Sequence, residues 1–362
     1  MNAMPWEHAR NVLCIRLDAL GDVLMCTPAM RAIKESLPGC RLTLLSSPSG
    51  AAAAPYIAEL DAVIEYPAPW IKGSAMQTGS GGAAMIALLA AQRFDAAVIF
   101  TSYSQSALPA ALLCQLAGIP ARLAHCRENP YQLLSTWVAD PEPDEQVRHE
   151  VQRQLDLVAS VGWHASCSKL SFSVPQADLA WVHARLALIG IGPQQPFILF
   201  HPGASALSRR YPAPQWAAVL RELSQRCDWP LVLSGDTAEI GLVDAIRELS
   251  GVAVQSLAGQ LDVGRLGAAI SRASVLVSNN TGPAHIAAAL GTPLVNLYAL
   301  TNPQHTPWHV DSRLLFHDVP CRFCYKSTCP QGHNDCLAKV RPERVVEAVR
   351  SLMWHAERAV PT

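Results

Sequence analysis

The sequence predicts an α/β protein made of two consecutive units, each built on a parallel sheet. Short apolar segments alternate with helical patterns along the whole chain, which is typical of parallel α/β construction. The apolar segments are nearly continuous runs, as expected of strands that helices cover on both faces. At 362 residues the chain is also longer than one typical domain.

Each half of the chain has its own set of expected strands. In the first half these are 12–17, 41–46, 62–66 and 96–100, with helices such as 23–36 and 83–92 between them. In the second half they are 197–200, 230–234, 254–256, 275–278 and 293–298.

The boundary between the two units is expected near residues 173–196, which gives an N-terminal domain over 1–175 and a C-terminal domain over 176–341. The segment 67–82 is rich in Pro, Gly and Ser and predicts a long exposed loop. A helix around 148–161 is expected to serve packing and not the site. The last helix, 342–356, begins with a proline in its first turn.

The composition excludes some function classes. Half of the residues are hydrophobic, 16% are charged and the net charge is −1, so no overall field recruits nucleic acid or an anionic membrane. No apolar run reaches the roughly 18 residues that span a bilayer. The first apolar segment is interrupted by Arg16 and Asp18, which indicates a buried strand and not a signal peptide. We therefore expect a cytoplasmic protein whose cysteines are reduced.

A strand, a polar turn and a helix follow one another at residues 275–291, with Thr281 and Gly282 in the turn and His285 behind it. This layout directs backbone N–H groups and the positive end of a helix at one point, where a phosphate can bind. It favours an anionic ligand that carries a nucleotide. A purely structural strand–turn–helix has the same pattern, so the local sequence leaves both interpretations open.

A second strand–turn–helix places two carboxylates, Asp18 and Asp22, directly after the first strand. Open α/β sheets bind ligands at the carboxyl ends of their strands. Asp22 is therefore a candidate general base. The alternative is a helix-capping role, in which its carboxylate accepts backbone N–H bonds.

Two further turns carry candidate ligand-binding residues. After the strand at 197–200 come His201 and Gly203, and then the pair Arg209 and Arg210, which could pair with a phosphate or simply be solvated. Glu239 follows the strand at 230–234. Its carboxylate suits ribose hydroxyls or an adenine amine, and it suits helix capping equally well.

Taken together, these motifs resemble the family 9 glycosyltransferases, the ADP-heptose:lipopolysaccharide heptosyltransferases. The resemblance extends over residues 11–353 and is carried by four blocks in the same order and spacing. These are Leu20-Gly21-Asp22, His201-Pro202-Gly203-Ala204 with Arg209-Arg210-Tyr211-Pro212, the turn from Gly235 to Glu239, and Asn279-Asn280-Thr281-Gly282-Pro283 with His285.

The resemblance implies a GT-B fold, in which two Rossmann-like domains face each other across a cleft. The first domain would hold the acceptor, the second the sugar nucleotide, and the terminal helix 342–356 would pack back on the first. Asp22 matches the family's catalytic base. The matches for donor binding are Arg209, Glu239, Asn280, Thr281, Gly282 and His285, with His201, Gly203 and Arg210 as further candidates.

One position departs from the family pattern. The family's heptosyltransferases usually have aspartate where this chain has Asn280. Asparagine keeps the hydrogen bonding but removes the charge, which puts the identity of the donor sugar in question.

The reaction expected from this resemblance is inverting transfer of a heptose or related sugar from an ADP-sugar to a lipopolysaccharide core acceptor. The chain contains no Asp-x-Asp, so the start of the helix after Gly282 and Arg209 are expected to meet the leaving-group charge without a metal. The alternatives are transfer to protein hydroxyls, another NDP-sugar donor, or a non-catalytic protein that binds sugar nucleotides. A lipid-anchored acceptor would bring the protein to the cytoplasmic face of the inner membrane.

Basic residues are expected to line the acceptor side, since a lipopolysaccharide core carries carboxylates and phosphates. Asp18, Arg122 and Arg127 are candidate acceptor-binding residues, and the other basic candidates are Lys72, Arg93 and His125.

Four cysteines lie close together in the sequence near the C-terminal end: Cys321, Cys324, Cys329 and Cys336. A Cys-x2-Cys pair is a usual half of a zinc or iron site, and four thiolates would make such a metal structural. Reduced structural thiols or a local disulfide are the alternatives.

Overall fold

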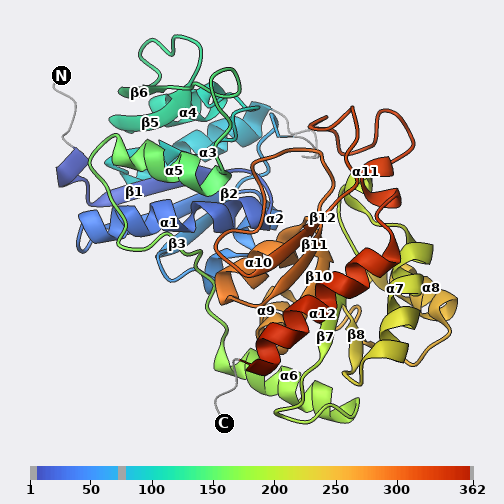
Figure 1. Ribbon diagram of the computed structural model, residues 1–362. Helices are drawn as coiled ribbons and strands as arrows, with labels where there is room; N and C mark the ends of the chain where they lie inside the picture. Colours follow the sequence, from blue (N-terminus) through green and yellow to red (C-terminus); the bar gives the residue numbers. More distant parts are fainter. Residues whose placement is uncertain (1–5, 72–78, 359–362) are drawn as a thin grey trace. The chain divides into compact units, whose positions relative to one another are not determined.

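The computed structural model describes residues 6–71 and 79–358 and divides into two compact units, Met1–Ser171 and Phe172–Thr362 (Figure 1). Each unit contains a six-stranded sheet, and every strand pair within both sheets is parallel. Parallel strands need a crossover between them, and helices provide most of these crossovers. The α/β class predicted from the sequence is confirmed.

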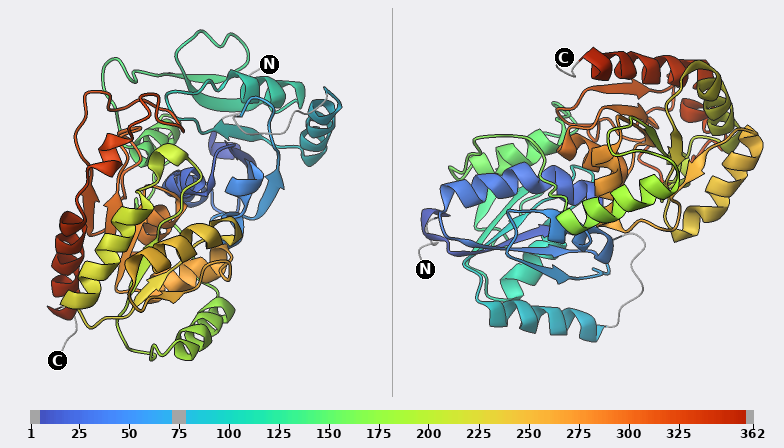
Figure 2. Two further views of the ribbon diagram at one scale, coloured as in Figure 1. Left: turned by 90° about the vertical axis from the view of Figure 1, so that its right-hand side faces the viewer. Right: turned by 90° about the horizontal axis from the view of Figure 1, so that it is seen from below.

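The first sheet has the strand order β3-β2-β1-β4-β5-β6. Its strands are β1 (Asn11–Arg16), β2 (Arg41–Ser46), β3 (Ala62–Glu65), β4 (Ala96–Ile99), β5 (Ala121–Cys126) and β6 (Thr136–Ala139). Its helices are α1 (Leu20–Ser36), α2 (Pro48–Ala51), α3 (Gly79–Gln92), α4 (Leu108–Leu116) and α5 (Glu150–Ala159). Helices α1 and α5 pack together on one face of the sheet, and α3 and α4 lie on the other (Figures 1 and 2).

The second sheet has the order β12-β11-β10-β7-β8-β9. Its strands are β7 (Ile198–His201), β8 (Leu231–Leu233), β9 (Gln255–Ser256), β10 (Val275–Asn279), β11 (Leu294–Leu297) and β12 (Ser312–Leu315). Its α-helices are α6 (Gln176–Leu188), α7 (Ala213–Arg226), α8 (Ile240–Ser250), α9 (Val263–Arg272), α10 (Gly282–Leu290), α11 (Asp335–Ala338) and α12 (Pro342–Arg358). Helix α7 contacts both α8 and α12, whereas α9 contacts α6 and α10.

Two features of the structure differ from those expected. The terminal helix, expected on the first domain, buries Val345, Val349 and Leu352 in the core of the second unit, because its apolar stripe packs against α7 and β10–β12. The predicted loop 67–82 ends early, since Gly79 already begins α3. The part of that loop at 72–78, including Lys72, lies outside the described residues.

The apolar strands form the two cores as expected, and fully buried residues run along β1, β4, β7 and β10. No helix within residues 6–71 and 79–358 is both long enough and apolar enough to cross a bilayer.

Candidate functional site

Asp22 lies in the first turn of α1, where it closes the turn from β1 into the helix. Its Oδ2 accepts a hydrogen bond of 3.1 Å from the backbone N–H of Ala19, the residue that caps the helix. Its Oδ1 lies 3.3 Å from Nη2 of Arg16. The side chain keeps 20% of its surface exposed, so the carboxylate is held on two sides and still open to a ligand. The capping interpretation is thus correct, and it leaves room for a chemical role.

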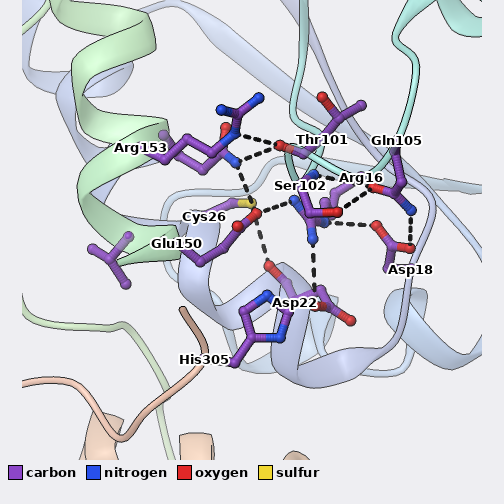
Figure 3. A network of polar contacts seen from close by, with 12 residues as sticks. Arg16, Asp18, Asp22, Cys26, Thr101, Ser102, Gln105, Glu150, Arg153 and His305 are labelled. Carbon is purple, nitrogen blue, oxygen red and sulfur yellow. Dashed lines mark hydrogen bonds and ion pairs between the residues drawn. The ribbon is translucent and has the colours of Figure 1, made fainter. Parts of the chain in front are cut away.

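Arg16, the last residue of β1, is the centre of a carboxylate cluster (Figure 3). Its guanidinium is 1% exposed and faces three carboxylates: Nε is 2.8 Å from Asp18 Oδ2, Nη2 contacts Asp22, and Nη1 is 2.6 Å from Glu150 Oε1. Burial alone would lower the pKa of Arg16, but these carboxylates raise it well above its usual value. The arginine is therefore a permanent cation, and it stabilises all three negative charges.

Asp18 is the second carboxylate of the turn. Its Oδ2 faces Arg16, and its Oδ1 accepts a hydrogen bond of 2.7 Å from Nε2 of Gln105. Burial raises the pKa of Asp18; Arg16 and the Gln105 hydrogen bond lower it, whereas the negative charges of Asp22 and Glu150 raise it further. Burial is the largest of these effects, so the pKa of Asp18 lies above that of an exposed aspartate.

Glu150 connects this cluster to a second group of buried charges. It begins α5, is fully buried, and also accepts a hydrogen bond of 2.9 Å from Gln154 Nε2. On the same helix Arg153 pairs with both oxygens of Asp140 at 2.6 and 2.9 Å and with Glu142. The helix around 148–161 thus supplies a residue of the site, contrary to our expectation that it serves packing alone.

A cavity of about 950 Å³ opens beside the two aspartates, entirely within the first unit. Its wall combines carboxylates and hydroxyls with apolar surface that includes Trp70 and Phe100, a mixture that suits a sugar. The described residues of this wall include no lysine, arginine or histidine. Its hydrogen-bonding side chains are Asp18, Asp22, Ser47, Ser49, Thr101, Ser104, Gln105 and Ser106.

The basic residues proposed for the acceptor lie elsewhere. Arg122 is buried in β5, where its guanidinium donates hydrogen bonds to four backbone carbonyls, those of Ile119, Pro120, Gln132 and Leu133. Arg93 and Arg127 are exposed and do not line the cavity.

His125 is a core residue, 4% exposed, whose Nε2 is 3.2 Å from the carbonyl of Arg153. Burial, followed by the charge of Arg153, lowers its pKa to about 4. It is therefore neutral at pH 7 and provides no positive charge for an acceptor.

The candidate donor residues gather at the carboxyl ends of β7, β8 and β10 in the second unit. Asn279, at the end of β10, ties two of these ends together: its Nδ2 donates to the carbonyls of Pro202 at 2.7 Å and Gly203 at 3.2 Å. Its Oδ1 accepts a hydrogen bond of 3.1 Å from the N–H of Tyr211. This buried amide fixes the loop after β7 against the turn that leads into α10.

The turn into α10 has the geometry expected of an anion site. Thr281 precedes the helix in extended conformation, Gly282 begins it, and Pro283 fits a first turn because it needs no N–H partner. His285 is buried one turn into the helix. Asn280 is 4% exposed, and its Oδ1 accepts a hydrogen bond of 3.2 Å from the N–H of Ala299. An aspartate could accept the same bond, so this contact is compatible with either residue.

Glu239 folds back against the loop after β7. It forms a reciprocal cap with Asp236, in which its Oε2 accepts the N–H of Asp236 at 3.0 Å. The same oxygen lies 3.6 Å from Nε2 of His201. A Cβ at position 203 would overlap the Glu239 carboxylate, so only glycine allows this close approach.

His201 is a buried hydrogen-bonding group. Burial lowers its pKa, although the carboxylates of Glu239 and Asp236 partly offset the effect. Its Nδ1 lies 3.1 Å from Oγ of Ser234. Because its neutral form is favoured, His201 orients neighbouring groups and is not a phosphate-binding cation.

The two arginines of the second unit differ in their surroundings. Arg210 donates from Nε to the carbonyl of Ala204 at 2.7 Å, which closes the loop after β7. Arg209 ends the short helix Leu207–Arg209, and its positive charge acts on the buried Tyr298. Ser208 anchors this helix, since its Oγ donates to the carbonyl of Lys326 at 2.8 Å. Of the pair, Arg209 is the candidate for a phosphate partner.

The cysteine cluster does not form the structural metal site that its spacing suggested. Within residues 6–71 and 79–358, no three His, Cys, Asp or Glu side chains are arranged to hold a metal ion. All four thiols are free and half-buried, and Cys321 Sγ is 4.0 Å from His333 Nε2. The reason is local packing, because Cys321 and Cys336 lie against the apolar cluster of Tyr298, Leu300 and Val319. Of the three interpretations, reduced structural thiols fit best.

Arg16, Gln105 and Glu150 were not predicted as site residues, and Asn279 was not predicted to hold the loop after β7. An arginine inside an otherwise apolar strand was a usable signal for Arg16, since a buried cation requires partners. Glu150 gave no such signal, because it lies 134 residues from Arg16 in the chain.

The family model of glycosyltransferase family 9 (heptosyltransferase) matches residues 83–334, well over half of the chain. The chain belongs to this family. The family 9 membership expected from the sequence motifs is therefore confirmed.

Named relatives in this family are heptosyltransferases. Lipooligosaccharide heptosyltransferase 2 of Campylobacter jejuni is 28% identical over 174 residues, which cover 44% of this chain and 54% of that protein. Lipopolysaccharide heptosyltransferase 1 of Pseudomonas aeruginosa is 23% identical over 366 residues, 96% of this chain and 99% of that protein.

Among solved structures, ADP-heptose lps heptosyltransferase II of Escherichia coli superposes with a TM-score of 0.74 at 21% identity. That superposition covers 96% of this chain and 99% of the other. It confirms the predicted GT-B fold class.

Proposed function

We propose that this family 9 protein is an inverting glycosyltransferase that transfers a heptose from an ADP-sugar to a lipopolysaccharide core acceptor. The observation that carries the proposal is Asp22, a carboxylate held by Ala19 and Arg16 on the wall of a sugar-sized cavity. The names of the relatives support the substrate class, since they denote lipooligosaccharide and lipopolysaccharide heptosyltransferases.

In this proposal the first unit activates the acceptor. Asp22 accepts the proton of an acceptor hydroxyl as the oxygen attacks the anomeric carbon of the donor. The C–O bond to the sugar forms as the bond to the diphosphate breaks, which inverts the anomeric centre. Arg16 holds the carboxylate in place, and the hydroxyl side chains of the cavity are suited to the remaining acceptor hydroxyls.

The second unit would bind the donor and stabilise the leaving ADP. The start of α10, with Thr281 and Gly282, offers backbone and hydroxyl donors and the positive helix end to the diphosphate. Arg209 would add a positive charge. Glu239, held beside Gly203, would accept hydrogen bonds from the nucleoside. We propose that these groups meet the leaving-group charge and that transfer needs no metal.

The acceptor in this proposal is anchored to a lipid, so the enzyme would act where that lipid is exposed, at the cytoplasmic face of the inner membrane. The proposal is tested by incubating the protein with ADP-heptose and lipopolysaccharide cores truncated at successive sugars. Transfer of one heptose to one of these cores is expected. Binding of ADP with no transfer to any core would instead favour a non-catalytic sugar-nucleotide-binding protein.

The identity of the donor needs its own test because of Asn280. A thermal-shift panel of ADP-, UDP-, GDP- and CMP-sugars should show the largest stabilisation with ADP-heptose. A larger shift with another sugar nucleotide would change the donor in this proposal and leave the reaction class intact.

A further inference from the structure

The guanidinium of Arg16 lies behind the two aspartates of the cavity and does not itself line it. Asp18 and Asp22 belong to the cavity wall, whereas Arg16 and Glu150 are buried to 1% and 0% exposure. The four groups form one connected set through contacts of 2.6 to 3.3 Å (Figure 3). Arg16 therefore contacts Asp22 from the protein side, opposite the space that a ligand can enter.

Glu150 is the anchor of this set. Its Oε1 accepts hydrogen bonds from Arg16 Nη1 at 2.6 Å and from Gln154 Nε2 at 2.9 Å. The same Gln154 nitrogen donates to the carbonyl of Thr101 at 3.0 Å, and Arg153 donates to this carbonyl as well. Helix α5 is thereby fixed to the segment after β4, and Glu150 has little freedom to move.

We propose that Glu150 and Arg16 together are positioning residues that hold Asp22 in the orientation needed to remove the acceptor proton. This inference rests on the proposed function of Asp22. The guanidinium is planar and presents its donors in a fixed fork, so the carboxylate on one edge determines how the other edges face. With Glu150 on one edge, the remaining edges meet Asp18 and Asp22.

The charges of this set also help to orient Asp22. One guanidinium is shared by three carboxylates, so its orientation depends on all three. If Glu150 loses its charge, Arg16 is held less firmly on that edge and can shift toward the two aspartates, which changes the direction in which it holds Asp22. A lysine cannot replace Arg16, because a single ammonium group cannot donate along three edges.

The first test compares Glu150→Gln with the wild type in steady-state transfer and in ADP binding. Because proton transfer by a positioned base contributes about 100- to 10,000-fold, a misdirected base should lower kcat about tenfold or more. The KM for acceptor and the affinity for ADP should stay within about twofold. Glu59→Gln is the matched control, since Glu59 is a buried carboxylate that pairs with Arg31 at 2.9 Å and does not line the cavity.

A double-variant cycle separates positioning from general damage. Arg16→Met should lower kcat about 100-fold, and Arg16→Lys should restore less than a tenth of the wild-type rate. In the Arg16→Met background, Glu150→Gln should have no further effect on kcat, because Glu150 acts through Arg16. The double variant also removes both buried charges, so it can fold even where Arg16→Met alone leaves Glu150 without its cation.

A titration of Asp18 needs no substrate, so it tests the contacts of Glu150 and Arg16 whether or not the protein transfers a sugar. The groups that act on the Asp18 carboxyl are Arg16, Asp22, Gln105 and Glu150. In a carbon-13 NMR titration, Glu150→Gln should move the midpoint of Asp18 to lower pH, and Glu59→Gln should leave it unchanged. No movement, or equal movement in both variants, would overturn the inference, as would an unchanged kcat. A wild type that transfers nothing would overturn only the proposed function.

Discussion

The imidazole of His125 makes the first unit sensitive to mild acid. Its pKa of about 4 lies below the ordinary value of 6.5, because burial and the charges of Arg153 and Arg148 disfavour the protonated ring. A lowered histidine pKa gives stability that is present above pH 6.5 and is lost as the pH falls toward 4. Between pH 7 and pH 5 the unfolded chain takes up this proton and the folded one does not. The free energy of unfolding should therefore fall by about 2 kcal/mol.

The assay is hydrogen exchange of the β5 amides, residues 121–126, at pH 7 and pH 5 after correction for intrinsic rates. His125→Gln keeps a donor for the Arg153 carbonyl but cannot be protonated. The fall of about 2 kcal/mol in the free energy of unfolding between pH 7 and pH 5 should therefore be absent from this variant. Equal pH dependence in both proteins would show that the protonation of His125 does not cause the loss of stability. It would also reopen His125 as a charged residue for an acceptor.

Four further results are expected. Gly203→Ala should weaken ADP binding more than about tenfold by calorimetry, because its Cβ would displace the Glu239 carboxylate; unchanged affinity would contradict the close approach. Asn279→Ala should lower the free energy of unfolding by about 3 kcal/mol in urea, since three buried hydrogen bonds are lost. Arg122→Met should also lower the free energy of unfolding by about 3 kcal/mol and leave kcat unchanged. A lower kcat in a folded variant would instead support a role in acceptor binding. Dialysis against EDTA should change neither transfer nor the unfolding midpoint, and a loss of either would revive a metal site at the cysteines.

Much of the fold could be predicted because most strands are continuous apolar runs. The strand β5 was missed since it contains Arg122 and His125, which interrupt the apolar run; in the structure backbone carbonyls outside the strand accept or face their polar groups. The terminal helix was misplaced because its apolar stripe indicates burial without naming the surface that it covers.

The candidate site was predictable where its residues follow strands directly. Asp18, Asp22, Gly203 and Glu239 all lie at carboxyl ends of parallel strands, which the sequence order already indicates. The carboxylate partner that approaches Arg16 from α5 was not predictable, because a contact over 134 residues depends on tertiary packing.

The variant Asp22→Asn shows whether Asp22 removes the acceptor proton in a sugar transfer. Asparagine keeps the shape and can still accept the N–H of Ala19, but it cannot take up a proton. We expect kcat for transfer from ADP-heptose to a lipopolysaccharide core to fall by about 100-fold or more, while ADP affinity stays within about twofold. Transfer by the variant at close to the wild-type rate would show that Asp22 is not the base.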